Sequence, residues 1–171
     1  LVAFAMAMQA GSPPHRLAKA LSTFKGVQRR FSYKIKNDDF IFIDDYAHHP
    51  TEINAVFEAI SEMHPNKKVL AIFQPHLFSR TRDFADDFAK SLSQFENILL
   101  LDIYPAREEP IVGIDSQWLL EKITSTNKTL ISKEQIISEI KIQNPEVLVT
   151  MGAGDIGLEV MKIKNELSYA G

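Results

Sequence analysis

The strongest constraint on the fold is a regular alternation of short apolar runs and amphipathic segments from residue 40 onward. The apolar runs occupy residues 40–44, 68–73, 97–104, 128–132 and 146–152. Apolar side chains recur at helical spacing in residues 51–64, 81–95, 115–123, 132–142 and 155–167. Apolar strands separated by helices are typical of a parallel sheet that is covered on both faces. We therefore predict an α/β fold, Rossmann-like and doubly wound, with helices on both faces.

The segment before these repeats predicts an antiparallel edge strand and two further helices. Residues 30–36 alternate polar and apolar side chains, and Asn37-Asp38 predicts a tight turn into the strand at 40–44. This hairpin adds one antiparallel strand to a mostly parallel sheet. Residues 1–22 predict two helices joined at "GSPP", with Pro13 and Pro14 opening the second.

Composition excludes several classes of protein. The 171 residues include no cysteine, which excludes disulfides and thiolate metal sites and fits a reducing cytoplasm. The net charge of −3 does not indicate a nucleic-acid surface, and no apolar run is long enough to span a membrane. We expect a cytoplasmic protein that binds neither nucleic acid nor membrane. Because Leu1 is not a natural start, we expect the sequence to be a piece of a longer chain.

Polar loops follow four of the five predicted parallel strands. They are residues 44–50 ("DDYAHHP"), 74–82 ("QPHLFSRTR"), 102–110 ("DIYPAREEP") and 151–155 ("MGAGD"). Ligands of open α/β sheets bind beyond the carboxyl ends of the strands. We expect these loops to form one ligand-binding edge.

The first loop places two carboxylates beside two imidazoles at the start of a helix. Asp44 or Asp45 could cap backbone N–H groups, and His48 could bond a carbonyl oxygen. Zinc binding is the sharper alternative, but neighbouring histidines should point apart and no second histidine follows at helical spacing.

The other loops offer cations and a flexible backbone. We expect Arg80 and Arg82 to lie just before or within the first turn of a helix, where guanidinium groups suit a bound carboxylate or phosphate. The alternative for this pair is solvation beside Asp83, Asp86 or Asp87. The glycines of 151–155 allow either a tight turn or a close ligand, with Asp155 as a helix cap. We expect residues 104–110 to be a solvated loop. Of Arg29 and Arg30, one could lie along the surface and the other reach a phosphate.

Together these motifs resemble the Mur ligase family of ATP-dependent ligases. The similar segments are "FKGVQRRF" (24–31), "DDYAHHPTEI" (44–53), "FQPHLFSRT" (73–81), "DIYPAREEPI" (102–111) and "TMGAGDI" (150–156). They run over nearly the whole chain, and the doubled histidine is most similar to the member that joins L-alanine to UDP-N-acetylmuramate. The resemblance implies an acid–amino-acid ligase of peptidoglycan synthesis, of which this chain is the C-terminal, amino-acid-presenting domain.

The resemblance also implies roles for individual residues. Arg30 would reach the γ-phosphate of ATP, and Asp45 would bind the ribose hydroxyls. His48 and Arg80 would line the alanine and acyl-phosphate region, so that His48, Arg80 and Arg30 are the expected catalytic residues. Many family members have arginine where this chain has Leu77, so His76 or Arg82 could supply the missing substrate contact.

Further implications concern domains and partners. Residues 1–23 would be terminal helices of a central ATPase domain or a linker, and residues 24–171 the C-terminal domain. The P-loop motif is absent from this sequence, so ATP and Mg²⁺ would be bound mainly by the central domain. The expected partners are UDP-N-acetylmuramate, L-alanine and the other two domains; no metal site is expected here, and the isolated fragment should be inactive.

Two other functions remain open from sequence. The same fold could serve as a non-catalytic module that senses a nucleotide or peptide. A metal-dependent hydrolase built on Asp45, His48 and His49 is the other alternative.

Overall fold

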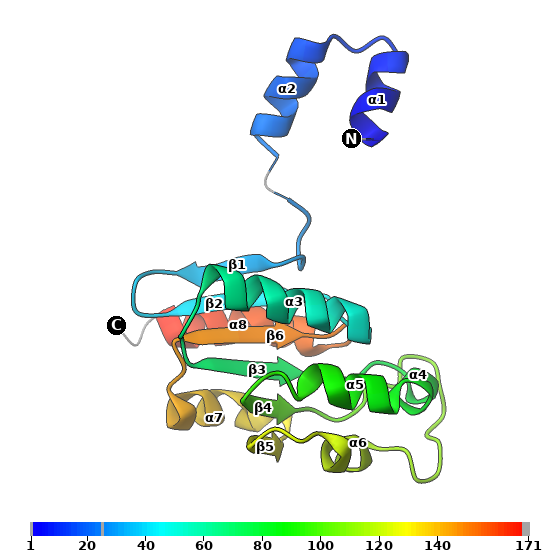
Figure 1. Ribbon diagram of the computed structural model, residues 1–171, viewed down its shortest axis with the longest axis vertical. Coiled ribbons are helices and arrows are strands. Elements are labelled where there is room, and N and C mark those ends of the chain that lie inside the picture. Colours follow the sequence, from blue (N-terminus) through cyan, green and yellow to red (C-terminus); the bar gives the residue numbers. More distant parts are fainter. Residues whose placement is uncertain (1, 25, 169–171) are drawn as a thin grey trace.

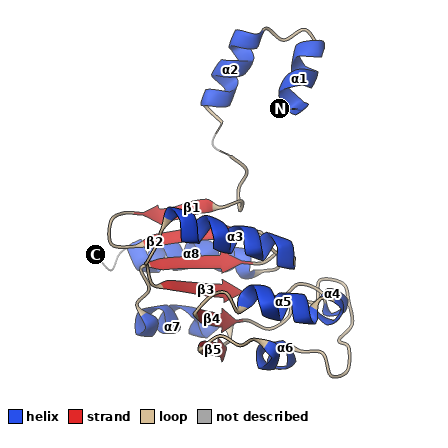
Figure 2. Ribbon diagram, viewed as in Figure 1, coloured by secondary structure: helices blue, strands red, loops and turns tan. Residues whose placement is uncertain are grey.

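The computed structural model describes residues 2–24 and 26–168, which form a six-stranded sheet with helices on both faces and a separate pair of helices (Figures 1 and 2). The strand order is β1-β2-β6-β3-β4-β5. The strands are β1 (Ser32–Lys36), β2 (Ile41–Asp45), β3 (Val69–Phe73), β4 (Asn97–Leu100), β5 (Asn127–Leu130) and β6 (Val147–Met151). All neighbouring strands except β1 and β2 are parallel, which confirms the predicted fold class.

The helices cover the sheet in two layers. One layer contains α3 (Pro50–Met63), α4 (Phe78–Asp83), α5 (Ala85–Leu92) and α6 (Ser116–Lys122); the other contains the 3-10 helix η1 (Lys133–Gln135), α7 (Ile136–Gln143) and α8 (Ile156–Ser168). Successive strand residues alternate between the two layers: Phe42 of β2 packs with the α7–α8 layer and Ile43 with the α3–α5 layer. Because both faces of the inner strands β2, β3, β4 and β6 are buried, these strands are mostly apolar, which is the signal the sequence carries.

The edge hairpin has a short connection that contains the predicted turn residues Asn37 and Asp38. β1 pairs antiparallel with β2, and residues 37–40 join them. Asn37 Oδ1 accepts hydrogen bonds from the backbone N–H groups of Asp39 (3.2 Å) and Phe40 (2.7 Å). The predicted tight turn at Asn37-Asp38 is therefore present as part of a four-residue connection, which the Asn37 side chain organises.

The helix predicted over residues 81–95 is two helices. Helix α4 begins at Phe78, and the chain bends at Phe84 before α5. The Phe84 ring packs on His49, with ring centroids 4.8 Å apart. The bend therefore serves a contact with a distant loop that helical periodicity cannot reveal.

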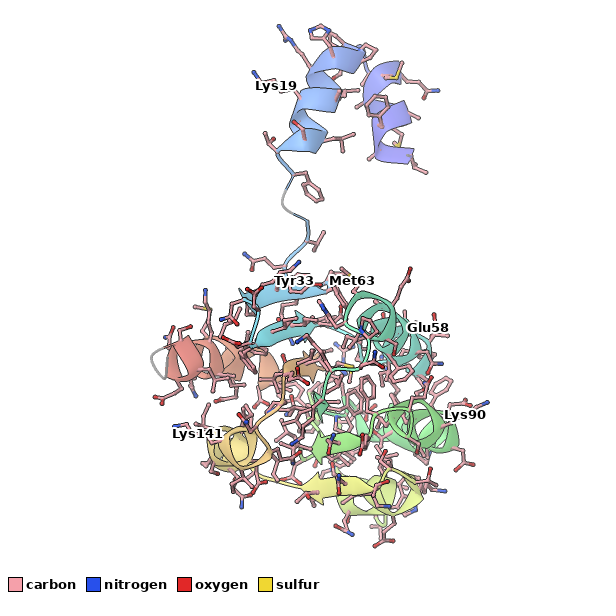
Figure 3. All side chains as sticks on the ribbon, turned by 60° about the vertical axis from the view of Figure 1, so that its left-hand side comes forward. Lys19, Tyr33, Glu58, Met63, Lys90 and Lys141 are labelled. Atoms are coloured by element: carbon pink, nitrogen blue, oxygen red, sulfur yellow. The ribbon has the colours of Figure 1, made fainter. Side chains whose placement is uncertain are left out.

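The helices α1 (Val2–Gln9) and α2 (Pro14–Ser22) form a hairpin that lies apart from the sheet (Figure 1). Neither helix contains a buried residue, and Figure 3 shows Lys19 of α2 far from the sheet. None of the described helices is long and apolar enough to cross a membrane. The domain boundary at residues 23–24 agrees with this arrangement but stays a prediction; residues 1, 25 and 169–171 of the predicted domains lie outside the described residues.

Candidate functional site

Four polar loops meet at one edge of the sheet, as predicted. They follow β2, β6, β3 and β4, which are adjacent and parallel, so their carboxyl ends point the same way. Backbone hydrogen bonds join the loops: Gly152 N donates to Asp45 O (3.3 Å) and Gln74 N donates to Met151 O (3.0 Å). An isolated bridge pairs His76 with Tyr104. The structure thus brings the predicted motifs together from segments more than 100 residues apart.

Asp45 is a half-buried carboxylate that organises the backbone around it. Its two oxygens accept hydrogen bonds from Phe31 N (2.6 Å) and Ala47 N (2.7 Å). This is the capping role that the sequence left open. A carboxylate has about four acceptor positions, so two of them remain for a ligand hydroxyl. Ribose binding by Asp45 stays a prediction.

The two neighbouring histidines point to different neighbours. His48 Nδ1 lies 3.0 Å from Tyr46 O, and because a carbonyl only accepts, this nitrogen carries the proton. With Nδ1 engaged by Tyr46 O, Nε2 is the ring nitrogen left for a ligand. His49 Nδ1 instead lies 2.7 Å from Thr51 Oγ1. Within residues 2–24 and 26–168, no three His, Cys, Asp or Glu side chains gather as metal ligands, so the hydrolase alternative has no ligand cluster.

His76 and Arg80 carry the two unpaired polar atoms of this edge. In the described part of the chain, His76 Nδ1 and Arg80 Nη1 are the buried side-chain atoms that lack a hydrogen-bond partner. The His76 ring stacks on Tyr104 with centroids 5.7 Å apart and lies 6.1 Å from the His48 ring. A buried guanidinium N–H without an acceptor is costly, and a bound anion would satisfy it. The pair therefore forms a candidate site for a carboxylate or phosphate.

Burial lowers the pKa of His76 below its ordinary value of 6.5, and the positive charge of Arg80 lowers it further. Below about pH 6.5, His76 is protonated in the unfolded chain but not in the folded protein. The free energy of unfolding should therefore decrease as the pH falls below about 6.5. We expect His76→Gln to reduce this dependence, measured by urea unfolding between about pH 7.5 and pH 5. The pKa of His64 is also lowered, mainly by burial. His64→Gln is therefore the matched control, and it should remove the separate contribution of His64 to the pH dependence of unfolding. An unchanged pH dependence in His76→Gln would contradict the assignment.

The two arginines of α4 differ in their surroundings. Arg82 is half exposed, and its Nε donates to Asp83 Oδ1 at 2.7 Å, as in the solvated alternative. Arg80 is the third residue of the six-residue helix α4 and lies in its first turn, as predicted, whereas Arg82 lies in its last turn and not at the opening of a helix. The helix begins early because Leu77 turns the chain at φ 73° while its N–H donates to Tyr104 O. The argument from the helix start therefore fails for Arg82 only, and the buried Nη1 atom also distinguishes Arg80.

Arg29 and Arg30 also differ in their surroundings. The Arg29 side chain is half buried: its Nε donates to Asp44 Oδ2 (3.2 Å) and its Nη2 to Gly152 O (2.7 Å). Arg30 is exposed at the same edge. Of the two, Arg30 is therefore the residue that is available to a ligand.

Sequence reasoning missed several residues that hold the loops in place. Glu108, in the loop predicted to be solvated, accepts hydrogen bonds from Ser79 N (2.9 Å) and Ser79 Oγ (2.5 Å), which lower the pKa of Glu108. At the start of α8, Gln74 Oε1 accepts from Ile156 N (2.9 Å), while the Asp155 carboxylate accepts from the side chains of Gln74 and Lys133. Asp155 could be singled out from sequence as an acidic residue that follows a strand. No local pattern predicts that Gln74 bonds Asp155 and the start of α8.

Asp155 forms part of a small polar cavity beside the site. Its carboxylate accepts from Gln74 Nε2 (2.7 Å) and from Lys133 Nζ (2.5 Å). Burial alone would raise the pKa of Asp155, but these two bonds outweigh it and lower the pKa. The cavity, about 230 Å³, is also lined by Tyr104 and Ser132. Its Lys133, Asp155 and Gln74 groups satisfy one another.

Comparison with known proteins agrees with the geometry. The family described as "Mur ligase, glutamate ligase domain" matches residues 29–154. The UDP-N-acetylmuramate–L-alanine ligases of Christiangramia forsetii and Flavobacterium psychrophilum are 64% and 62% identical to this chain over 99% and 98% of its length. The chain spans about 37% of the length of these relatives.

Solved structures show the same fold at lower identity. The UDP-N-acetylmuramate–alanine ligase of Thermotoga maritima superposes with a TM-score of 0.75 at 23% identity, covering 98% of this chain and 36% of that one. The murein peptide ligase of Psychrobacter arcticus gives 0.68 at 24% identity, covering 100% and 36%. Because the family match covers all six strands and every residue of the four loops except Asp155, the chain belongs to the Mur ligase family as its glutamate ligase domain.

Proposed function

We propose that this chain is the C-terminal, amino-acid-presenting domain of an ATP-dependent ligase that joins L-alanine to UDP-N-acetylmuramate in peptidoglycan synthesis. The observation that carries the proposal is the buried pair of unpaired atoms, Arg80 Nη1 and His76 Nδ1, at the carboxyl edge of the sheet. An amino acid offers a carboxylate to the guanidinium and an amine to the imidazole. The names of the two curated relatives described above support the same reaction.

The residues at this edge divide between two ligands. Arg80 binds the carboxylate of alanine, and His76 and His48 lie where its amine can donate to an imidazole nitrogen. Asp45 and Arg30 face a nucleotide, and Arg82 contributes positive charge at the rim. ATP, bound with Mg²⁺ mainly by the central domain, supplies the phosphoryl group that activates the sugar carboxylate. The cations of this domain then stabilise the charge that develops there.

The α1–α2 hairpin belongs, on this proposal, to the central ATPase domain or to the linker that follows it. Its helices contain no buried residue, and even the large apolar side chains of Val2 and Met6 are 75% and 65% exposed. Such side chains stabilise a helix only when another surface covers them. The complete site forms when the two domains close, and the enzyme works in the cytoplasm, where ATP is supplied.

The test compares the full-length polypeptide with this chain alone. We expect the full-length enzyme to release ADP only when both UDP-N-acetylmuramate and L-alanine are present. Residues 1–171 alone should form no product, because no P-loop is present in them. ATP-dependent ligation by the isolated chain would contradict the assignment of roles. A full-length polypeptide that binds nucleotide without turnover would indicate a sensing module instead.

A further inference from the structure

Arg29 joins the segment before β1, residues 26–31, to two strand ends of the candidate site. Its side chain bonds Asp44 of β2 and Gly152 after β6, and its guanidinium carbon lies 5.2 Å from the centre of the Tyr46 ring. We propose that Arg29 is a positioning residue, which holds Arg30 and Asp45 in the geometry that binds the nucleotide. The inference rests on the proposed function for its kinetic consequences, but its structural part can be tested without activity.

The backbone around Arg30 is held on both sides. Arg29 and Phe31 have φ values of 57° and 43°, in the left-handed region that L side chains rarely adopt. Arg29 O accepts from Tyr46 N (2.7 Å), and Phe31 N donates to the carboxylate of Asp45 (2.6 Å). Strained backbone persists only where surrounding contacts determine it. The same contacts fix the direction in which Arg30 leaves the sheet and the orientation of the Asp45 carboxylate.

The side chain of Arg29 provides the anchor for this segment. Asp44 is 1% exposed, and its other oxygen accepts from Thr150 Oγ1 (3.0 Å), so it needs a cation nearby. Gly157 leaves room for that cation, because a Cβ atom there would lie 2.6 Å from Arg29 Nη1. The guanidinium donates to Asp44 and Gly152 O with separate nitrogens. We call this pair of hydrogen bonds the Arg29 fork. Lysine has one compact ammonium group and cannot make both bonds in this geometry.

The anchor also borders the amino-acid half of the site, but less directly. The Tyr46 ring, which contacts Arg29, lies 5.3 Å from the His48 ring. Arg30 and Asp45 are instead held through hydrogen bonds on residues 29 and 31. Loss of the fork should therefore impair nucleotide binding and turnover more than it impairs alanine binding.

The experiment uses Arg29→Lys in the full-length enzyme, because lysine keeps a positive charge beside buried Asp44. We expect the KM for ATP to rise about tenfold or more and kcat to fall, with the KM for alanine within about threefold. Lys34→Met is the matched control: Lys34 Nζ also faces Asp44 Oδ2, at 3.8 Å, but Lys34 lies on β1 and outside residues 26–31. It should change thermal stability and leave the KM for ATP within about twofold.

A second measurement separates this inference from the proposed function. In residues 1–171 alone, hydrogen exchange of the Phe31 and Tyr46 amides should accelerate in Arg29→Lys and not in Lys34→Met. Unchanged exchange, or an unchanged KM for ATP in a full-length enzyme that depends on Arg30, would overturn the positioning role. If exchange accelerates but the wild-type full-length enzyme ligates nothing, the anchor stands and the proposed function fails.

Discussion

Replacing Arg80 by alanine in the full-length enzyme should lower kcat/KM for L-alanine about 100-fold or more, while the KM for ATP stays within about threefold. The reason is the buried Nη1 atom, which has no acceptor within the described residues and is free to bind the alanine carboxylate. A charge-assisted hydrogen bond to a buried guanidinium nitrogen contributes about 2–3 kcal/mol, which is the size of the expected loss. Steady-state kinetics with each substrate varied separately measures the effect.

Two further variants sharpen this test. Arg80→Lys keeps the charge but not the planar donor, so it should recover only part of the activity. Arg82→Ala should cost far less than Arg80→Ala, because the Arg82 guanidinium is half exposed and already paired with Asp83. A loss of ATP affinity with alanine binding untouched would contradict the role of Arg80. Equal losses at both arginines would show that burial does not distinguish them.

The architecture could be predicted because it rests on local patterns. Strands such as β3 (Val69–Phe73) are apolar on both faces, and α3 and α8 carry apolar side chains at helical spacing. Burial on two faces therefore left a direct record in the sequence. The bend at Phe84 and the left-handed Leu77 left none, because both depend on contacts with distant loops: the ring of His49 and the carbonyl of Tyr104.

The site could be predicted at the level of loops but not of side chains. Parallel topology alone brings the ends of β2, β6, β3 and β4 to one edge. In three pairs of like residues, one member faces the candidate ligand site and the other bonds the surrounding protein, and the sequence does not show which is which. The pairs are Arg29 and Arg30, His48 and His49, and Arg80 and Arg82. Each division depends on partners such as Gly152, Thr51 and Asp83, of which only Asp83 was weighed from sequence. The orientation of a side chain is decided by tertiary contacts, which a single sequence does not display.

Replacing Gly152 by alanine should lower the free energy of unfolding of this chain by about 2–4 kcal/mol. The sequence left two interpretations of the glycines at 151–155, a tight turn or a close ligand. Gly152 has a φ of 144°, and a Cβ atom there would lie 2.8 Å from the backbone oxygen of Gln74. That oxygen belongs to β3's own loop and cannot move without disturbing the hydrogen bond from Gln74 N to Met151 O.

The matched control is Gly113→Ala, which isolates the clash from the backbone strain. Gly113 also has a positive φ, 79°, but no heavy atom lies within 4 Å of the position of its Cβ. It should therefore lose only the conformational term, about 1 kcal/mol, in the same urea titration. Equal losses in the two variants would show that the loops tolerate a methyl group between them. A different outcome is that Gly152→Ala is as stable as the wild type but the full-length enzyme loses substrate affinity. The methyl group would then occupy space that is needed only when a ligand is bound. In that case Gly152 serves the close approach of a ligand.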